Sequence, residues 1–143
     1  MSMNELEIIG GTKAQKELVT KVVGWYLKKA LPRVRTLDIT VRLTKCMEKS
    51  GAYGYCLEGD SNRNFEIEID KNLRLFDFVS TLLHELTHLK QYARKEMVFQ
   101  PDGRTRWKKK VYPLTVSYEE SPWEKEAFRN EKQLAIECFE AVL

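Results

Sequence analysis

The chain has few cysteines and no arrangement of them that would serve a structural role. Cys46, Cys56 and Cys138 are an odd number, and no two of them form a Cys-x-x-Cys pair. A disulfide framework needs paired cysteines, and a cysteine-rich zinc site needs closely spaced ones. Neither a disulfide framework nor such a zinc site is therefore indicated, and a reducing compartment such as the cytoplasm is the simplest expectation.

Long hydrophobic runs are also missing. No apolar stretch approaches the roughly 20 residues of a membrane-spanning helix, and residues 1–9 lack the basic start and apolar core of a signal peptide. The charge balance of 24 basic against 21 acidic residues leaves a net charge of only +3. We therefore expect a cytoplasmic protein with no membrane partner, and the net charge alone does not indicate a nucleic-acid ligand.

The remaining composition is that of an ordinary globular domain. Apolar residues make up 43% of the chain and charged residues 31%, with only 7 glycines and 4 prolines, so disordered and collagen-like chains are excluded. A length of 143 residues falls within the roughly 100–200 residues of one domain and suffices for a buried core. We predict a single domain that spans residues 1–143.

Hydrophobic periodicity predicts three helices. Apolar residues recur at helical spacing over residues 13–30, directly after a capping box that begins at Thr12. The same spacing returns over residues 75–93, with Asn72 as the expected N-cap. Ser121, followed by proline and then by glutamate at the third helical position, predicts a last helix that runs to the C-terminus.

Between the first two helices, the apolar period changes from about four residues to two. Alternation over residues 37–43, 53–57 and 65–69 predicts strands, and the turn-forming residues 59–64 join the last two in an antiparallel hairpin. Residues 104–120 are weakly periodic and are expected to form a loop, with at most a short strand. The predicted fold class is α+β, with a small and mainly antiparallel sheet of three strands.

The second helix carries the motif His84-Glu85-Leu86-Thr87-His88, an H-E-x-x-H pattern. Residues four apart lie one helical turn above each other, so both imidazoles can bind one metal ion. Glu85 lies beside them, close enough to act on a water molecule bound to that ion. The sequence therefore predicts a metal site at His84 and His88, with Glu85 as its general base.

The motif resembles that of the zincin metallopeptidases. Residues 84–96 and 122–127 together are similar to small metallopeptidase domains of phage and bacterial genomes, and more distantly to SprT-type and ImmA/IrrE-type proteases. The resemblance implies a minimal zincin-like fold, in which the C-terminal helix supplies a further ligand. It also implies a location in the cytoplasm of a bacterial host if the chain is phage-encoded.

A catalytic zinc ion needs a third protein ligand, and both histidines are already used. A carboxylate is the usual choice, as in sites that resemble those of gluzincins. Glu126 is favoured over Glu124, because Glu124 is expected to close the capping box of Ser121, whereas Asn130 could accept a hydrogen bond from a ligating histidine beside Glu126. All the carboxylates considered are Glu119, Glu120, Glu124, Glu126 and Glu131.

One zinc ion with an open coordination position would activate a water molecule, and Glu85 would act first as base and then as acid. The expected reaction is hydrolysis of a protein or peptide substrate. Tyr118, ahead of Tyr112 and Arg129, is the expected donor to the oxygen that becomes charged. In zincin-like folds the strand before the active-site helix commonly borders the cleft, which would place residues 65–70 beside an extended substrate.

The alternative is a metal-containing binding protein without catalysis, associated with DNA through a basic strip. The strip surrounds Trp107, and cations with an aromatic ring suit phosphate contact and base stacking. A basic run in a loop is usually only solvated, so nucleic acid is not the leading prediction. The basic strip consists of Arg104, Arg106, Lys108, Lys109 and Lys110.

Overall fold

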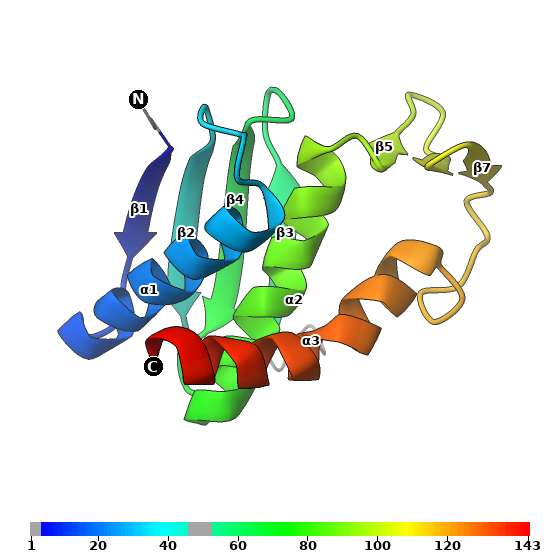
Figure 1. Cartoon of the computed structure of the whole chain (residues 1–143). Helices are drawn as coiled ribbons and strands as arrows, with labels where there is room; N and C mark the ends of the chain where they lie inside the picture. The colour runs from blue at the N-terminus through cyan, green and yellow to red at the C-terminus, as the bar shows by residue number, and fades with distance from the viewer. Residues whose placement is uncertain (1–3, 46–52) are drawn as a thin grey trace.

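The structure, a computed structural model, describes residues 4–45 and 53–143 and confirms the α+β class (Figure 1). Within these residues the chain forms three helices, one sheet of four strands and one sheet of three strands. In chain order the elements are β1 (Glu5–Ile9), α1 (Lys13–Ala30), β2 (Asp38–Thr44), β3 (Gly54–Glu58), β4 (Asn64–Asp70), α2 (Leu75–Ala93), β5 (Met97–Phe99), β6 (Thr105–Trp107), β7 (Lys110–Tyr112) and α3 (Pro122–Val142).

The main sheet has the strand order β1-β2-β4-β3 and is mixed, unlike the expected sheet of three mainly antiparallel strands. β1 adds a fourth strand, which pairs with β2 in parallel. β2 also pairs with β4 in parallel, so only β3 is antiparallel to its neighbour. Parallel pairing joins segments that are distant in sequence, and alternation within each segment carries no information about it.

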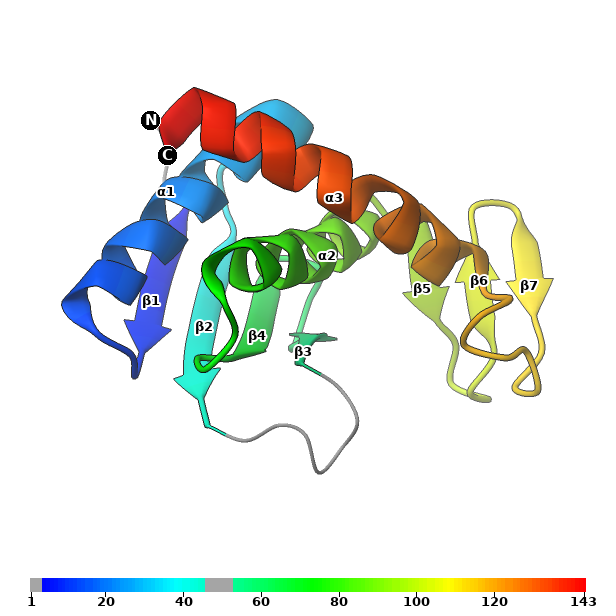
Figure 2. The same ribbon diagram turned by 90° about the horizontal axis from the view of Figure 1, so that it is seen from below.

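α1 and α2 cover the same face of the main sheet, and α3 crosses them on the side away from the sheet (Figure 2). The side chains of β2 alternate accordingly, because Ile39, Val41 and Leu43 are buried under the helices whereas Asp38 and Arg42 are exposed. Burial of each such aliphatic side chain contributes about 1.5–3 kcal/mol. The apolar layer between sheet and helices thus fixes the position of α2.

α2 is buried on almost all sides because the sheet and α3 enclose it. The helix begins after Arg74, two residues later than expected from Asn72. The backbone N–H of Asn72 donates instead to the Asp70 carboxylate at 2.9 Å, which closes a turn between β4 and α2. The leucines of α2 with no exposed surface are Leu82, Leu83, Leu86 and Leu89.

The two predicted capping boxes have different outcomes. In α1 the N–H of Gln15 donates to Thr12 Oγ1 at 3.1 Å and the N–H of Thr12 donates to Gln15 Oε1 at 3.0 Å, which confirms the first box. α3 also begins where expected, with Ser121 as N-cap and Pro122 in the first turn, but Ser121 makes no side-chain cap. Its hydroxyl donates to the carbonyl of Tyr118 at 2.8 Å instead.

β5, β6 and β7 form a small antiparallel sheet beyond the C-terminal end of α2, set apart from the main sheet (Figure 1). Residues 104–120 therefore contain two short strands, β6 and β7, where a loop with at most one was expected. Trp107 is buried at the end of β6, and its ring centroid lies 6.3 Å from that of Trp123 on α3.

Two further expectations concern cysteines and membranes. Cys56 and Cys138 are buried free thiols, and Cys46 lies outside the described residues. None of the helices in the described part of the chain combines the length and the apolar character needed to cross a membrane.

Candidate metal centre

Two histidines on α2 direct the same ring nitrogen toward α3. His84 and His88 are four residues apart, and their ring centroids are separated by 4.9 Å. The two residues are only 5% and 7% exposed, because α3 packs against this face of α2. Their Nε2 atoms therefore point into a space that is largely shielded from bulk water.

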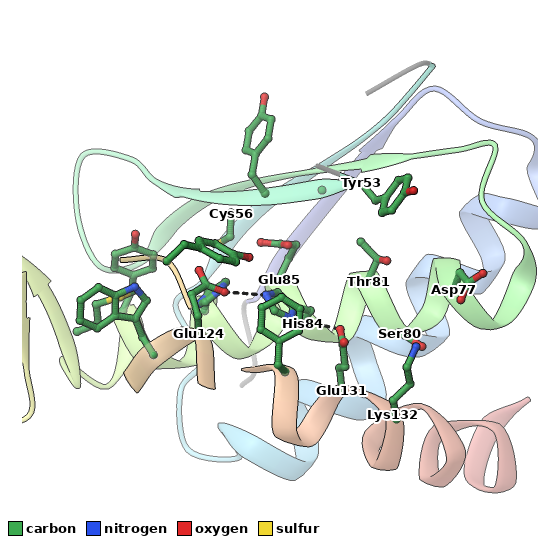
Figure 3. A pocket seen from close by; sticks show the side chains of 18 of the residues that line it. Tyr53, Cys56, Asp77, Ser80, Thr81, His84, Glu85, Glu124, Glu131 and Lys132 are labelled. Carbon is green, nitrogen blue, oxygen red and sulfur yellow. Dashed lines mark hydrogen bonds and ion pairs between the residues drawn. The ribbon is translucent and has the colours of Figure 1, made fainter. Parts of the chain in front are cut away.

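Glu124, in the first turn of α3, completes a three-residue cluster (Figure 3). Its Oε1 lies 3.0 Å from His84 Nε2 and 3.1 Å from His88 Nε2, and its side chain is 12% exposed. Ligands bound at about 2.0–2.1 Å in a tetrahedral zinc site would be about 3.3–3.4 Å apart. Residues His84, His88 and Glu124 can therefore hold a metal ion after a small adjustment of their side chains.

The structure does not bring Glu126, the favoured third ligand, to the histidines. Glu126 Oε1 lies 2.9 Å from Lys90 Nζ and accepts a hydrogen bond from Gln91 Nε2 at 3.0 Å. Residues two apart in a helix point in nearly opposite directions, so only one of the two glutamates can face the cluster. Ser121 forms no capping box, so the side chain of Glu124 is free to face the histidines. The expected third member of the cluster is therefore corrected from Glu126 to Glu124.

A stripe along α3 is the sequence signal that could have identified Glu124. Ala127, Ala135 and Cys138 are the buried residues of this helix. Glu124 and Glu131 lie on the same stripe, because positions 124, 127, 131, 135 and 138 follow one another at intervals of three and four residues. Two carboxylates on a stripe of small buried residues indicate polar partners on the facing helix, and here those partners are the histidines.

The second ring nitrogen of each histidine faces an oxygen atom. His88 Nδ1 lies 2.8 Å from Gln91 Oε1. His84 Nδ1 lies 3.2 Å from Glu131 Oε2, which is an ion-pair distance without the alignment of a hydrogen bond. Asn130, expected in this role, is exposed and lines a separate pocket between the three helices. Sequence reasoning did not identify Gln91, although it lies three residues after His88 on the same helix.

The charges of the cluster stabilise one another in the metal-free protein. Burial opposes the charged form of His84, but the carboxylates of Glu124 and Glu131 outweigh it and raise the pKa of His84 to about 9. Burial likewise disfavours ionised Glu124, yet its two histidine partners lower its pKa to about 2. A metal ion that binds at neutral pH must therefore displace a proton from His84.

Glu85 faces the pocket from the side of α2 that lies under β3 (Figure 3). The residue is 6% exposed. Burial raises the pKa of its carboxyl group to about 7, although the neighbouring histidine charges act in the opposite direction. A carboxyl group with a pKa near neutrality can accept and return a proton at physiological pH.

The cluster and Glu85 line a pocket of about 930 Å³ between β3, α2 and α3. Residues 53–56, at the start of β3, form its opposite wall. The expectation that residues 65–70 border the cleft is corrected, because β4 pairs with β2 on one side and β3 on the other. Among the described strands, β3 is the one at this edge of the sheet, and an edge strand has backbone groups that can pair with another chain.

Of the expected oxygen-stabilising residues, only Tyr118 reaches the pocket. It is 59% exposed and lines the opening together with Glu124. Burial of its hydroxyl and the negative charge of Glu124 raise the pKa of Tyr118, so the phenol stays protonated and can donate a hydrogen bond. Tyr112 packs against Trp123 instead, and Arg129 is exposed outside the pocket.

The basic strip lies on the small sheet, away from the histidines. All five of its residues are exposed, and none lines the pocket. The amino group of Lys108 lies 5.2 Å from the ring centroid of Trp107, and Arg104 forms an ion pair with Asp102 at 2.7 Å. The structure therefore gathers these cations on one hairpin without connecting them to the candidate metal centre.

Comparisons of the chain with protein-family models, with curated proteins and with solved structures found no match. The resemblance to zincins therefore stays a prediction from two short segments of sequence. Any conclusion about function depends on the geometry of the site itself.

Proposed function

We propose that the protein is a zinc-dependent metallopeptidase with a zincin-like active site that holds one zinc ion. The observation that carries this proposal is the convergence of His84 Nε2, His88 Nε2 and Glu124 Oε1 beside a buried carboxylate in an open pocket. Two imidazole nitrogens and a carboxylate oxygen are a donor set that zinc binds, and three protein ligands leave one coordination position open.

The residues around this position match the steps of peptide hydrolysis. A zinc ion held there would polarise a substrate carbonyl and lower the pKa of a water molecule toward about 7. Glu85, with a pKa of about 7, would take the proton of that water and return it to the leaving amine. The Tyr118 hydroxyl would donate to the carbonyl oxygen as charge develops on it.

The position of β3 supports a polypeptide substrate. Its outer edge can pair with an extended peptide through backbone hydrogen bonds, which do not depend on the substrate's side chains. Gly54 allows the strand to approach α2 closely, since a Cβ atom there would lie 2.9 Å from the Glu68 carbonyl oxygen and 3.0 Å from Thr81 Cγ2. Because β3 and the cluster line the same pocket, an extended peptide on β3 would lie beside the opening of that pocket.

Glu85→Gln tests the proposal, because the amide preserves the shape of the side chain but cannot act as a base. We expect the variant to keep its zinc and to lose about 10²–10⁴-fold in hydrolysis. Zinc content is measured by mass spectrometry, and hydrolysis by digestion of an unbiased peptide library. Glu140→Gln, an exposed glutamate of α3, is the matched control and should behave as wild type.

The results separate the parts of the proposal. Equal cleavage by wild type and Glu85→Gln would assign the activity to a contaminating protease. If His84→Ala and His88→Ala both retained zinc, the proposal of a metal centre at these residues would be wrong. Zinc retained at full occupancy by Glu124→Ala but lost by Glu126→Ala would overturn the ligand assignment.

A second candidate function is a metal-containing protein that binds nucleic acid without catalysis. The gathering of five exposed cations beside aromatic rings on one hairpin favours it, because cations contact phosphates and rings stack on bases. Zinc binding without hydrolysis by wild type, together with salt-dependent DNA binding, would support this function over the first. The two free buried thiols agree with a cytoplasmic location in either case.

A further inference from the structure

Gln91 is a buried amide that contacts three groups around the candidate metal centre. The residue has no exposed surface. Its Oε1 lies 2.8 Å from His88 Nδ1, and its Nε2 donates to the carbonyl oxygen of Trp123 at 3.0 Å and to Glu126 Oε1 at 3.0 Å. The amide thus uses both of its N–H donors and its oxygen in a place that water does not reach.

The two partners of Nε2 determine which way the amide faces. A backbone carbonyl and a carboxylate paired with a lysine can only accept hydrogen bonds. If the amide were turned over, its oxygen would face both of these acceptors, and the carbonyl of Trp123 and the carboxylate of Glu126 would each lose the hydrogen bond from Gln91. The oxygen of Gln91 must therefore face His88.

We infer that Gln91 is a positioning residue that presents His88 Nε2 to the metal, an inference that rests on the proposed zinc site. Because Gln91 Oε1 can only accept, His88 Nδ1 must carry a proton. A neutral imidazole has a single N–H proton, so His88 Nε2 keeps the lone pair that a metal ion needs. His88 Nε2 lies 3.1 Å from Glu124 Oε1, so a metal ion bound by these residues would replace the proton that the two atoms share without it.

The same amide also positions the ligand on α3. Trp123 directly precedes Glu124, and the hydrogen bond to its carbonyl ties the first turn of α3 to α2. One side chain therefore acts on two of the three donor groups of the cluster. Such outer partners commonly change metal affinity by 10–100-fold when they are removed.

Glu126 and Lys90 hold the far side of the amide. Lys90 Nζ lies 2.9 Å from Glu126 Oε1 and 3.2 Å from Glu96 Oε1. The ion pair keeps the Glu126 carboxylate in place as an acceptor for Gln91. Glu126, expected from sequence to bind the metal, would thus support it through Gln91 and His88.

The test measures zinc affinity by chelator competition and the proton positions of His88 by ¹H–¹⁵N NMR on the full chain. In zinc-loaded wild type we expect a proton on His88 Nδ1 and the metal on Nε2. Gln91→Met keeps the size of the side chain but cannot accept, and should lower zinc affinity about 10–100-fold. Gln133→Met, at an exposed position on α3, is the matched control and should leave affinity unchanged.

A double variant separates positioning from mere packing. Gln91→Glu with Glu126→Gln exchanges amide and carboxylate, which restores an acceptor for His88 and one hydrogen bond between positions 91 and 126. It should recover the part of the affinity that depends on the acceptor for His88, whereas the hydrogen bond to the Trp123 carbonyl stays lost. Thermal unfolding with a chelator present checks that each variant is folded, and the wild-type NMR measurement needs no variant.

Three results would overturn the inference. They are zinc bound through His88 Nδ1 in wild type, zinc affinity of folded Gln91→Met within about twofold of wild type, and no zinc binding by wild type at all. Peptide hydrolysis enters none of these measurements. A protein that binds zinc as inferred but cleaves no peptide would contradict the proposed peptidase function and leave the role of Gln91 supported.

Discussion

Raising the pH should destabilise the zinc-free protein through His84. The pKa of His84 is raised from 6.5 to about 9 because Glu124 and Glu131 outweigh the effect of burial. A group with a raised folded-state pKa contributes stability that is fully present below its unfolded pKa and is lost as the pH rises through its folded pKa. The loss from His84 therefore falls between pH 6.5 and about 9.

The magnitude follows from the same two pKa values. A rise from 6.5 to about 9 corresponds to about 3 kcal/mol, of which about 2 kcal/mol is lost between pH 7 and pH 9. For a chain of 143 residues this lowers the melting temperature by roughly 6–8 °C. The carboxyl group of Glu85, with a pKa of about 7, acts mainly below this range and adds little to the loss.

The assay is thermal and urea unfolding at pH 7, 8 and 9, with a chelator and with saturating zinc. Zinc-loaded protein should show a smaller loss, because its histidines are already neutral. Glu124→Gln should reduce the loss of stability between pH 7 and pH 9 in the zinc-free protein. Glu126→Gln should leave this loss unchanged, because the Glu126 carboxylate does not contact His84. A zinc-free protein equally stable at pH 7 and 9, or a loss abolished only by Glu126→Gln, would refute this reasoning.

Two further predictions address the edge strand and the basic strip. Gly54→Ala should destabilise the protein by about 1–3 kcal/mol in urea unfolding, because the added methyl group meets β4 and α2 at 2.9–3.0 Å. Gly24→Ala, on α1 with open space around it, should instead stabilise the protein by about 0.5–1 kcal/mol. Equal effects of the two substitutions would contradict the close packing of β3. If the protein binds DNA, changing Lys108, Lys109 and Lys110 to alanine should reduce the slope of log affinity against log salt by about two to three and leave zinc content unchanged. Tight binding with an unchanged slope would place the contact elsewhere.

Features encoded within one helix could be predicted from the sequence. The spacing of His84 and His88 follows from helix geometry alone, and the Thr12 capping box involves residues three apart. The choice of Glu124 and the contact of Gln91 with Trp123 depend on how α3 docks on α2, which no local pattern specifies. The parallel pairing of β1 and β2 escaped prediction for the same reason.

The segment between α2 and α3 connects two helices that pack directly against each other. His88 and Glu124 are fixed by helix packing and by the amide of Gln91, and none of these contacts involves the small sheet of β5, β6 and β7. Substitutions at the exposed positions of that sheet can therefore accumulate with little effect on the cluster, whereas Trp107 and Tyr112 are constrained because both rings pack against Trp123, next to Glu124. Met97 and Phe99 nevertheless line the pocket, so variation there would change which molecules enter. The fold thus separates the residues that hold the cluster together from a part whose variation would alter access to the pocket.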